Sequence, residues 1–371
     1  MSAIDLFEIF LTAPPGLEPA LADELNDKQF ANSKITQGGV TIEGGWPDVW
    51  RANLEIRGAS RILARIAQFR VVHLAQLDKH SRAVDWKRVL RSDVPVRVDA
   101  SARRSKLYHA GAIAQRIETA IVEELGAPVS KDAEVRVLAR IDDNVCTISV
   151  DTSGELLHRR GFKEAVAKAP MRETLAALFL RECGFKGDEP VYDPMCGSGT
   201  FVIEAAEIAA GLHPGRARNF AFEHLAGFDP AAWQGLRTGN AASEPGLSFY
   251  GSDKDAGAIG ASEANAERAG VAGIASFQQK SVSDIDAPVG PPGLLIVNPP
   301  YGARIGNLKA LYGVYHAMGQ SLRGRFAGWR IGLITSEDKL ARATRLPFGK
   351  PSRTIDHGGI KVRLYQAKIT S

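Results

Sequence analysis

The second half of the chain alternates short apolar segments with alanine-rich helical segments, and this alternation restricts the possible folds more than any other feature. The apolar segments are Val191–Tyr192, Leu247–Tyr250, Leu294–Val297 and Ile331–Thr335, and the helical ones are Glu173–Cys183, Thr200–Gly211 and Ala256–Ala269. This order is typical of a doubly wound α/β fold with a parallel sheet. The apolar/polar alternation after His357-Gly-Gly predicts a last, antiparallel strand that closes the sheet.

The first 150 residues consist of short strand and helix patterns separated by Pro and Gly. The period-two alternation from Val94 predicts a strand, and Gly111–Leu125 has helical spacing with Gly126 at its end. Val135–Ile141 and Val145–Asp151 flank a short polar turn and predict a β-hairpin. We expect small α+β units ahead of the α/β domain.

Length and composition exclude several classes of protein. A chain of 371 residues with 44% hydrophobic and 24% charged residues predicts a globular protein of more than one domain. The acidic start of the chain does not resemble a signal peptide, and no apolar run is long enough to span a membrane, so we expect a cytoplasmic protein without membrane contact. Cys146, Cys183 and Cys196 lack the spacing of a disulfide framework or a zinc site, so no metal is expected.

Positive charge is concentrated in one segment. Between Arg51 and Lys106 there are fourteen Lys and Arg residues against five Asp and Glu residues, a net charge of +9, although the whole chain is only +4. Such a segment is either a solvated surface or a contact for nucleic acid. We take Arg103, Arg104, Lys106 and Tyr108 as candidate contacts to the phosphates or bases of a nucleic acid, while Tyr108 and His109 could equally face the core at a helix start.

A glycine-containing turn predicts the position of a nucleotide-like ligand. Asp193-Pro-Met-Cys-Gly-Ser-Gly-Thr200 directly follows a strand and directly precedes a helix, where glycines and free N–H groups admit a polar ligand. Neither the dinucleotide fingerprint nor a P-loop is present, which disfavours NAD and ATP. Asp253 follows the next strand and is suited to ribose hydroxyls, unless it caps the following helix. The sixty residues from Asp193 to Asp253 require a looped-out insertion containing Arg216–Leu236.

The tetrapeptide Asn298-Pro299-Pro300-Tyr301 directly follows the apolar strand Leu294–Val297 and predicts the catalytic centre. Two prolines stiffen the turn, so the Asn298 side-chain oxygen and the Pro299 carbonyl can accept from one exocyclic amino group. Tyr301 offers a ring on which a flipped base can stack. The scattered histidines have no acid at obvious spacing, so no histidine base is proposed.

Together with Arg160-Gly-Phe and Ala169-Pro-Met-Arg-Glu-Thr174, these motifs resemble the THUMP-domain class I RNA methyltransferases, and more narrowly the bacterial large-subunit ribosomal RNA guanine-N2 methyltransferases. The resemblance implies a ferredoxin-like unit over residues 1–64, a THUMP domain over 65–155 and a Rossmann-like class I methyltransferase domain over 156–371. It also implies that S-adenosylmethionine is bound by Pro170, Arg172, Thr174, Asp193, Met195, Cys196, Gly197, Ser198, Gly199, Thr200 and Asp253. Adenine would be contacted by Ser281 or by Asp284, because Ser281 stands where the family commonly has an acid.

Three functions follow as hypotheses. The first is methylation of guanine N2 in ribosomal or transfer RNA, and it is the one we favour. The second is methylation of another planar amine or amide, such as adenine N6 in DNA or glutamine in a protein. The third is a non-catalytic RNA-binding protein, which the intact Asp193, Gly197, Gly199 and Asn298 argue against. A monomer and a homodimer are both compatible with the sequence.

Overall fold

The computed structural model describes residues 6–164, 171–239, 245–301 and 308–370. Within them the chain forms two compact units. The first unit contains Met1–Ala13, Ala22–Leu157 and Arg218–Gly239, and the second contains Pro14–Leu21, His158–Ala217 and Asn240–Ser371. The insertion expected between Asp193 and Asp253 therefore contributes residues 218–239 to the first unit.

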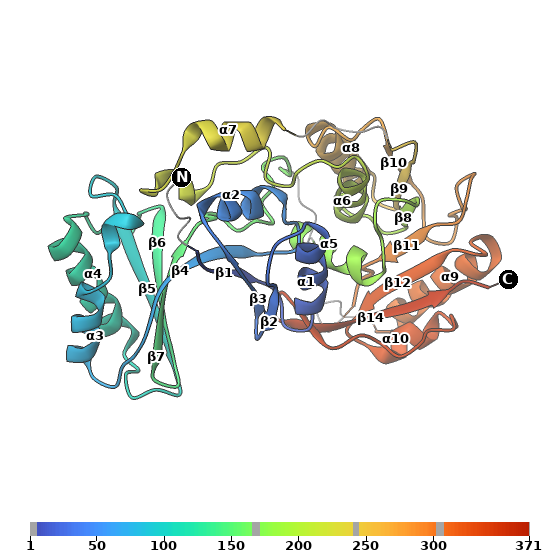
Figure 1. Ribbon diagram of the computed structural model, residues 1–371. Helices are drawn as coiled ribbons and strands as arrows, with labels where there is room; N and C mark the ends of the chain where they lie inside the picture. Colours follow the sequence, from blue (N-terminus) through green and yellow to red (C-terminus); the bar gives the residue numbers. More distant parts are fainter. Residues whose placement is uncertain (1–5, 165–170, 240–244, 302–307, 371) are drawn as a thin grey trace. The chain divides into compact units, whose positions relative to one another are not determined.

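The first unit is built on one seven-stranded sheet in the order β2-β3-β1-β4-β7-β6-β5 (Figure 1). Its strands are β1 (Phe7–Thr12), β2 (Lys34–Thr36), β3 (Gly39–Gly44), β4 (Arg61–Arg70), β5 (Val96–Arg103), β6 (Val135–Asp142) and β7 (Val145–Asp151). The expected hairpin is confirmed as β6 and β7, and β5 is parallel to β6. Asp143 and Asn144 both have positive φ, as a two-residue hairpin turn requires.

Strand β4 joins the two parts of this sheet. Its first half pairs with β1, and most of its length pairs with β7 across a bulge between Arg65 and Ala67. The boundary expected between residues 64 and 65 thus falls inside one continuous strand, which explains why the sequence shows no linker there.

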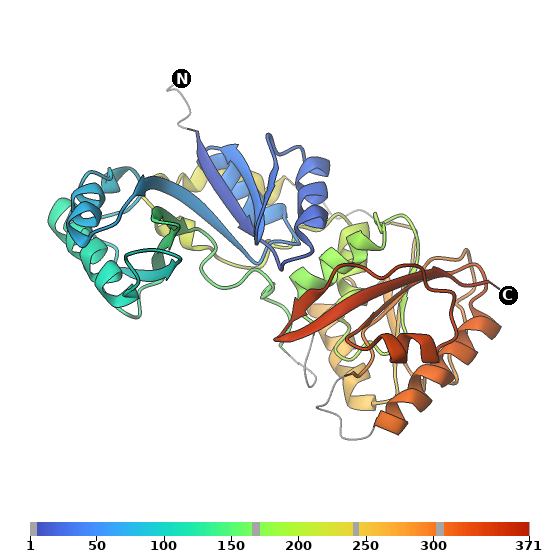
Figure 2. The same ribbon diagram turned by 90° about the horizontal axis from the view of Figure 1, so that it is seen from below.

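The helices of the first unit lie at both ends of the sheet. They are α1 (Glu18–Asp27), of which residues 18–21 belong to the second unit, α2 (Trp46–Glu55), α3 (Leu74–Arg82), η1 (Trp86–Arg88), α4 (Ala110–Leu125), η2 (Ala221–His224) and α7 (Pro230–Thr238). In both ribbon views α3 and α4 run side by side next to β5, β6 and β7 (Figures 1 and 2). Helix α4 ends at Gly126, as expected.

The second unit contains a seven-stranded sheet in the order β10-β9-β8-β11-β12-β14-β13. Its strands are β8 (Val191–Asp193), β9 (Phe249–Asp253), β10 (Ala275–Gln279), β11 (Leu294–Val297), β12 (Arg330–Thr335), β13 (Ile355–His357) and β14 (Ile360–Lys368). The five strands from β10 to β12 are parallel, and β14 is antiparallel to β12. The expected parallel sheet with an antiparallel last strand is confirmed. The sequence analysis did not anticipate β10 or the edge strand β13.

Helices cover this sheet as two groups. One group is α5 (Glu173–Glu182), α6 (Thr200–Ala209) and α8 (Ala256–Arg268), and the other is α9 (Leu308–Arg325) and α10 (Asp338–Ala343). Leu295 and Val297 of β11 share a buried cluster with Tyr315 and Met318 of α9. Because β11 is covered on both faces, all four of its residues are buried. The residue that follows β11 is therefore held in a fixed position.

Candidate active site

A tight turn between β8 and α6 forms the centre of the candidate cofactor site. Gly197 and Gly199 have φ of 55° and 82°, and Gly199 caps α6. A Cβ on Gly199 would lie 3.1 Å from Ser262 in addition to the strain of its positive φ. The turn is also fixed from α8, because Ser262 Oγ donates to the Gly197 carbonyl (2.9 Å) and Asn265 Nδ2 donates to the Ser198 carbonyl (3.1 Å). Sequence reasoning missed both α8 residues, since a Ser or an Asn inside a helix has no distinctive pattern.

Asp193 is the last residue of β8, and its side chain is buried. One carboxylate oxygen accepts from the Met195 N–H at 3.0 Å. Burial raises the pKa of Asp193 to about 8, and repulsion from Asp253 adds to the shift. A carboxyl group placed so unfavourably at a glycine turn marks a functional position rather than a stabilising one.

Asp253 ends β9, the strand next to β8. Its two carboxylate oxygens accept from the backbone N–H groups of Gly197 (3.1 Å) and Asp255 (3.0 Å). Each oxygen keeps further lone-pair capacity for ligand hydroxyls. Asp255, not Asp253, caps α8, because its side chain accepts from Gly257 and Ala258. The helix-cap alternative for Asp253 is therefore wrong.

Ser281 and Asp284 lie in the turn that follows β10. Lys280 N–H donates to the Asp253 carbonyl, so this turn is next to Asp253. Ser281 is half-buried and its hydroxyl is 3.0 Å from that of Ser283, whereas Asp284 is exposed. Both stay candidates for the adenine contact.

The Asn-Pro-Pro-Tyr motif follows β11 at the same sheet edge as Asp193 and Asp253, because the three strands are parallel. The Asn298 Oδ1 atom is buried and has no hydrogen-bond partner within the described part of the chain. The Tyr315 hydroxyl from α9 donates to the Pro300 carbonyl (3.3 Å) and is 3.2 Å from Thr335 Oγ1. Helix α9 therefore anchors the backbone of the motif. A buried amide oxygen without a donor is costly unless a ligand satisfies it.

Tyr301 is half-buried, and its ring packs against the apolar cluster beneath β11 and β12. Its hydroxyl is 2.7 Å from Nδ1 of His357, the last residue of β13. The sequence analysis set His357 aside because no acid accompanies it, and its partner proved to be a tyrosine 56 residues earlier in the chain.

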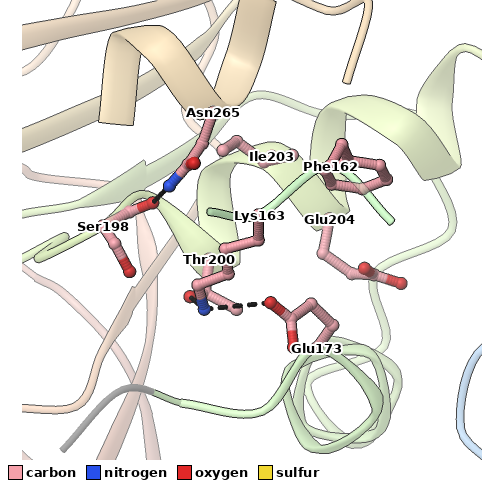
Figure 3. Close-up of a pocket in the computed structure, with 8 residues that line it drawn as sticks. All are labelled: Phe162, Lys163, Glu173, Ser198, Thr200, Ile203, Glu204 and Asn265. Atoms are coloured by element: carbon pink, nitrogen blue, oxygen red, sulfur yellow. Dashed lines mark hydrogen bonds and ion pairs between the residues drawn. The ribbon is translucent and has the colours of Figure 1, made fainter. Parts of the chain in front are cut away.

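The start of α5 contributes the remaining cofactor candidates. Pro170 lies outside the described residues, Arg172 is exposed at the N-cap, and Thr174 is buried in the first turn. Next to it, a small pocket is lined by Lys163, Glu173, Ser198 and Thr200 (Figure 3). Lys163 Nζ lies 2.9 Å from Glu173 and donates to Thr200 Oγ1 at 2.8 Å.

Lys163 links α5 to α6 through these two contacts, at the start of both helices. Ser198 and Thr200 line the lysine pocket with their side chains, while Cys196 is buried and its Sγ lies 3.9 Å from Ser262 Oγ. Lys163 went unnoticed in the sequence, although it directly follows the Arg160-Gly-Phe motif.

The candidate RNA contacts lie in the first unit, in the loop between β5 and α4. Tyr108 is 69% exposed and Lys106 is exposed, so the alternative that Tyr108 faces the core is wrong. Arg103 ends β5 and is exposed, whereas Arg104 forms an ion pair with Asp142 at 2.8 Å. Asn144 of the neighbouring hairpin turn accepts from the Lys106 N–H, which fixes the loop.

The described part of the chain offers neither a cluster of metal ligands nor a membrane-spanning helix. In the described ranges, no group of three or more His, Cys, Asp or Glu side chains is arranged to hold a metal ion. No helix there combines the length and the apolar character needed to cross a membrane.

Comparison with family models identifies the second unit. Residues 160–364 match the model described as RMKL-like, methyltransferase domain. The chain belongs to the RMKL-like methyltransferase family. Two further models match the rest of this methyltransferase: the RlmL ferredoxin-like domain over residues 8–63 and the THUMP domain over residues 73–151. The expected fold class is thereby confirmed.

Individual proteins similar to this methyltransferase fall into two groups. Ribosomal RNA large subunit methyltransferase K/L of Marinomonas sp. is 32% identical over 98% of this chain and 53% of its own length. The chain spans about half the length of the curated relatives it matches. Among crystal structures, the methyltransferase SMU.472 with bound SAH is 27% identical, covers 99% of both chains and has a TM-score of 0.90. A protein from Listeria monocytogenes, titled a predicted N6-adenine-specific DNA methylase, is 28% identical, covers 98% of this chain and 96% of its own, and has a TM-score of 0.89.

The cofactor of this methyltransferase is S-adenosylmethionine. The residues at the sheet edge fit it. The turn of Gly197–Gly199 lies beside Asp253, whose side chain accepts from the Gly197 N–H, and Asp253 presents carboxylate oxygens that suit ribose hydroxyls. Next to this site, Asn298 offers an unsatisfied acceptor for a second molecule.

Proposed function

We propose that this methyltransferase methylates the exocyclic N2 amino group of guanine in large-subunit ribosomal RNA. One observation carries the reaction type: the buried Asn298 Oδ1, with no donor in the described part of the chain, lies at the sheet edge where Asp193 and Asp253 also lie. The K/L relatives are named as ribosomal RNA methyltransferases, and this supports ribosomal RNA as the substrate.

The motif can hold an amino group by both of its N–H bonds. Because Tyr315 already donates to the Pro300 carbonyl, Asn298 Oδ1 and the Pro299 carbonyl are the two acceptors that the turn presents. When bound, S-adenosylmethionine supplies a methyl group on a positively charged sulfur. Asn298 and Pro299 draw on both N–H bonds, which favours a more tetrahedral nitrogen with its lone pair available for in-line attack. Catalysis then depends on position and electrostatics more than on a base.

Tyr301 completes the target-base site. Tyr301 directly follows the residues that supply the two acceptors. One face of its ring packs against the apolar cluster, and the other face is suited to stacking on a base that has been flipped out of its helix. The amino group after transfer is cationic and acidic enough to lose a proton to water.

We propose that RNA binds the face of β5 and β6 that α4 leaves uncovered. Val96, Val98, Val135 and Val137 are buried, as expected if these residues face α4, and Arg97, Arg103, Arg136 and Arg140 alternate with them on the opposite face. Arg136 and Arg140 pair with Asp99 and Asp142, but Arg97 and Arg103 have no acidic partner within the described residues. Their charge is available to phosphates. Arg103 leads into the loop with Arg104, Lys106 and Tyr108, and this loop extends the same surface.

The deciding experiment is transfer of tritiated methyl from S-adenosylmethionine to unmodified ribosomal RNA, with nucleoside analysis. Asn298→Ala should lower kcat by about 100-fold or more, as loss of one buried polar contact to the reacting group does elsewhere. The affinity for S-adenosylmethionine should change little, because Asn298 belongs to the target-base site. Gln320→Ala, which removes an exposed amide on α9, serves as the control and should be fully active.

The label must appear as N2-methylguanosine in large-subunit RNA. If N2-methylguanosine appears in transfer RNA instead, the proposed reaction is correct but the proposed substrate is wrong. If Asn298→Ala retains wild-type activity, the assignment of the motif is wrong.

A second candidate is methylation of adenine N6 in DNA. It is favoured by the name of the Listeria relative and by the chemistry, since adenine also carries an exocyclic amino group. Labelled N6-methyladenine in DNA, with no label in RNA, would establish it.

A further inference from the structure

The hydroxyl of Tyr301 forms a hydrogen bond with His357, a residue that belongs to none of the sequence motifs. His357 Nδ1 lies 2.7 Å from the Tyr301 hydroxyl oxygen, which is a short hydrogen bond for a hydroxyl and a ring nitrogen. The two residues come from different elements, the turn after β11 and the end of β13, and strands β12 and β14 separate these elements within the sheet.

The hairpin of β13 and β14 fixes the position of His357. Gly358 and Gly359 both have positive φ (61° and 82°), so the turn is of the two-residue type that sets the register of a hairpin. His357 pairs with Ile360, and Ile355 pairs with Val362, both of which are fully buried. Asp356 Oδ1 accepts from the Gly359 N–H at 3.1 Å and closes the turn. The hairpin therefore fixes the backbone from which the His357 imidazole contacts Tyr301.

The electrostatic surroundings determine the protonation states of Tyr301 and His357. Burial lowers the pKa of His357, and the nearby Arg172 lowers it further, against a smaller opposite effect of Asp356. Burial also raises the pKa of Tyr301 to about 12. Both groups are therefore neutral near pH 7, and the tautomer of the imidazole decides which of them donates. A phenol O–H is a stronger donor than a neutral imidazole N–H, and an imidazole nitrogen is a stronger acceptor than a phenol oxygen. The favoured arrangement therefore has the Tyr301 O–H donating to His357 Nδ1, with the proton of the imidazole on Nε2.

The backbone of the motif and the ring of Tyr301 are held by different residues. Tyr315 holds the carbonyl of Pro300 from α9, whereas the far end of the Tyr301 side chain is held from β13. With both ends fixed, the axis from Cβ through the ring to the hydroxyl is fixed. Because a phenolic O–H prefers to lie in the plane of its ring, donation to a fixed acceptor also favours the ring orientation whose plane contains His357 Nδ1.

We propose that His357 is a positioning residue that sets the plane of the Tyr301 ring, so that the hairpin of β13 and β14 forms one wall of the target-base site. This inference rests on the proposed function, because a stacking role for Tyr301 requires a base as substrate. It assigns to the last hairpin of the chain a role in recognising the base, beyond closing the sheet.

A matched pair of substitutions tests the role of the hydrogen bond. His357→Leu removes the acceptor and keeps the bulk, whereas His357→Asn places an amide oxygen near the former Nδ1. We expect His357→Leu to lower kcat/KM for RNA by up to about tenfold, the effect of one hydrogen bond, and His357→Asn to recover most of this loss. The dissociation constant for S-adenosylmethionine should stay the same in both variants.

Tyr301→Phe should match His357→Leu, and the double variant should be no worse than either single one, because both remove the same bond. The inference is wrong if His357→Asn is as impaired as His357→Leu, or if the two single losses add in the double variant.

A spectroscopic measurement tests the hydrogen bond between Tyr301 and His357 without an activity assay. In the full chain labelled with ¹⁵N-histidine, the His357 ring should show the Nε2–H tautomer, and Tyr301→Phe should remove this preference. The His357 signals are those absent from the His357→Asn spectrum. An Nδ1–H tautomer in the wild type would overturn the inference. This result is separate from the proposed function, which fails instead if the wild-type protein labels no RNA.

Discussion

Under the proposed function, single residues at the carboxyl edge of the second sheet carry the chemistry of this protein. Each is placed by the strand that precedes it: Asp193 by β8, Asp253 by β9 and Asn298 by β11. Their side chains are also energetically unfavourable in different ways. Asp193 has its carboxyl group buried, and Asn298 has an amide oxygen without a donor in the described residues. Such costs are typical of residues kept for a ligand rather than for stability.

Asp193 makes the stability of the protein depend on pH. Its pKa in the folded state, about 8, is above that of an unfolded aspartate, near 3.8. Between these values the folded state binds more protons, so the free energy of unfolding falls as the pH rises from about 4 to about 8. Asp193→Asn cannot ionise and should lose this dependence.

Urea unfolding of both proteins at pH 5 and pH 8 measures the effect. The advantage of Asp193→Asn over wild type should grow between the two pH values by at least about 1 kcal/mol, since one pKa unit corresponds to about 1.4 kcal/mol. Two proteins with the same pH dependence would show that Asp193 has an ordinary pKa.

At the level of strands and loops, we expect charge on the uncovered face of β5 and β6 to determine the affinity for RNA. Arg103→Ala should weaken RNA binding at all sequences. It should also lower the slope of log K against log salt by about 0.7 to 0.9, because one phosphate contact is lost. Arg91→Ala is the matched control, since Arg91 is neutralised by Asp93 through two hydrogen bonds. Filter binding between 50 and 200 mM salt measures both, and an equal slope for Arg103→Ala and wild type would exclude this face.

The elements themselves were predicted unevenly. Helices α5 and α8 and the hairpin of β6 and β7 match their expected ranges closely, because each has a clear periodicity and a capping or turn residue. Strand β9 begins two residues later than expected and includes Asp253, since Gly251 and Ser252 give no strand signal but are paired with β8 and β10. Helix α9 and strand β10 were missed, although α9 supplies much of the core beneath the motif.

For the whole molecule, the least expected finding is where residues 218–239 belong. They follow α6 in sequence, yet they pack in the first unit. Phe222 is fully buried there, with its ring centroid 5.0 Å from that of Trp233 and 6.3 Å from that of Trp50 in α2. An aromatic cluster thus joins segments that are about 170 residues apart in the chain.

Phe222→Ala should destabilise the first unit by about 3 to 5 kcal/mol, the usual cost of removing a buried phenylalanine ring. The rate of amide hydrogen exchange should increase more in α2 and β4 than in β8 and β11. Phe326→Ala, at a fully buried position in the second unit, should give the opposite pattern. If Phe222→Ala acts mainly on β8 and β11, the assignment of this segment to the first unit is wrong.

The sequence by itself determined the class of fold and predicted a site at the glycine turn, Asp253 and the Asn-Pro-Pro-Tyr motif, because each of these depends on local patterns along one strand and the residues after it. The structure places all three at the ends of neighbouring strands. The expected division at residues 64/65 and 155/156 stays a prediction, and only the structure shows that β4 runs across the first of these points. Tertiary structure alone decided which residues support the site. Ser262, Asn265, Lys163 and His357 each form a hydrogen bond with a residue 37 to 67 positions away, and only the folded chain brings such partners together.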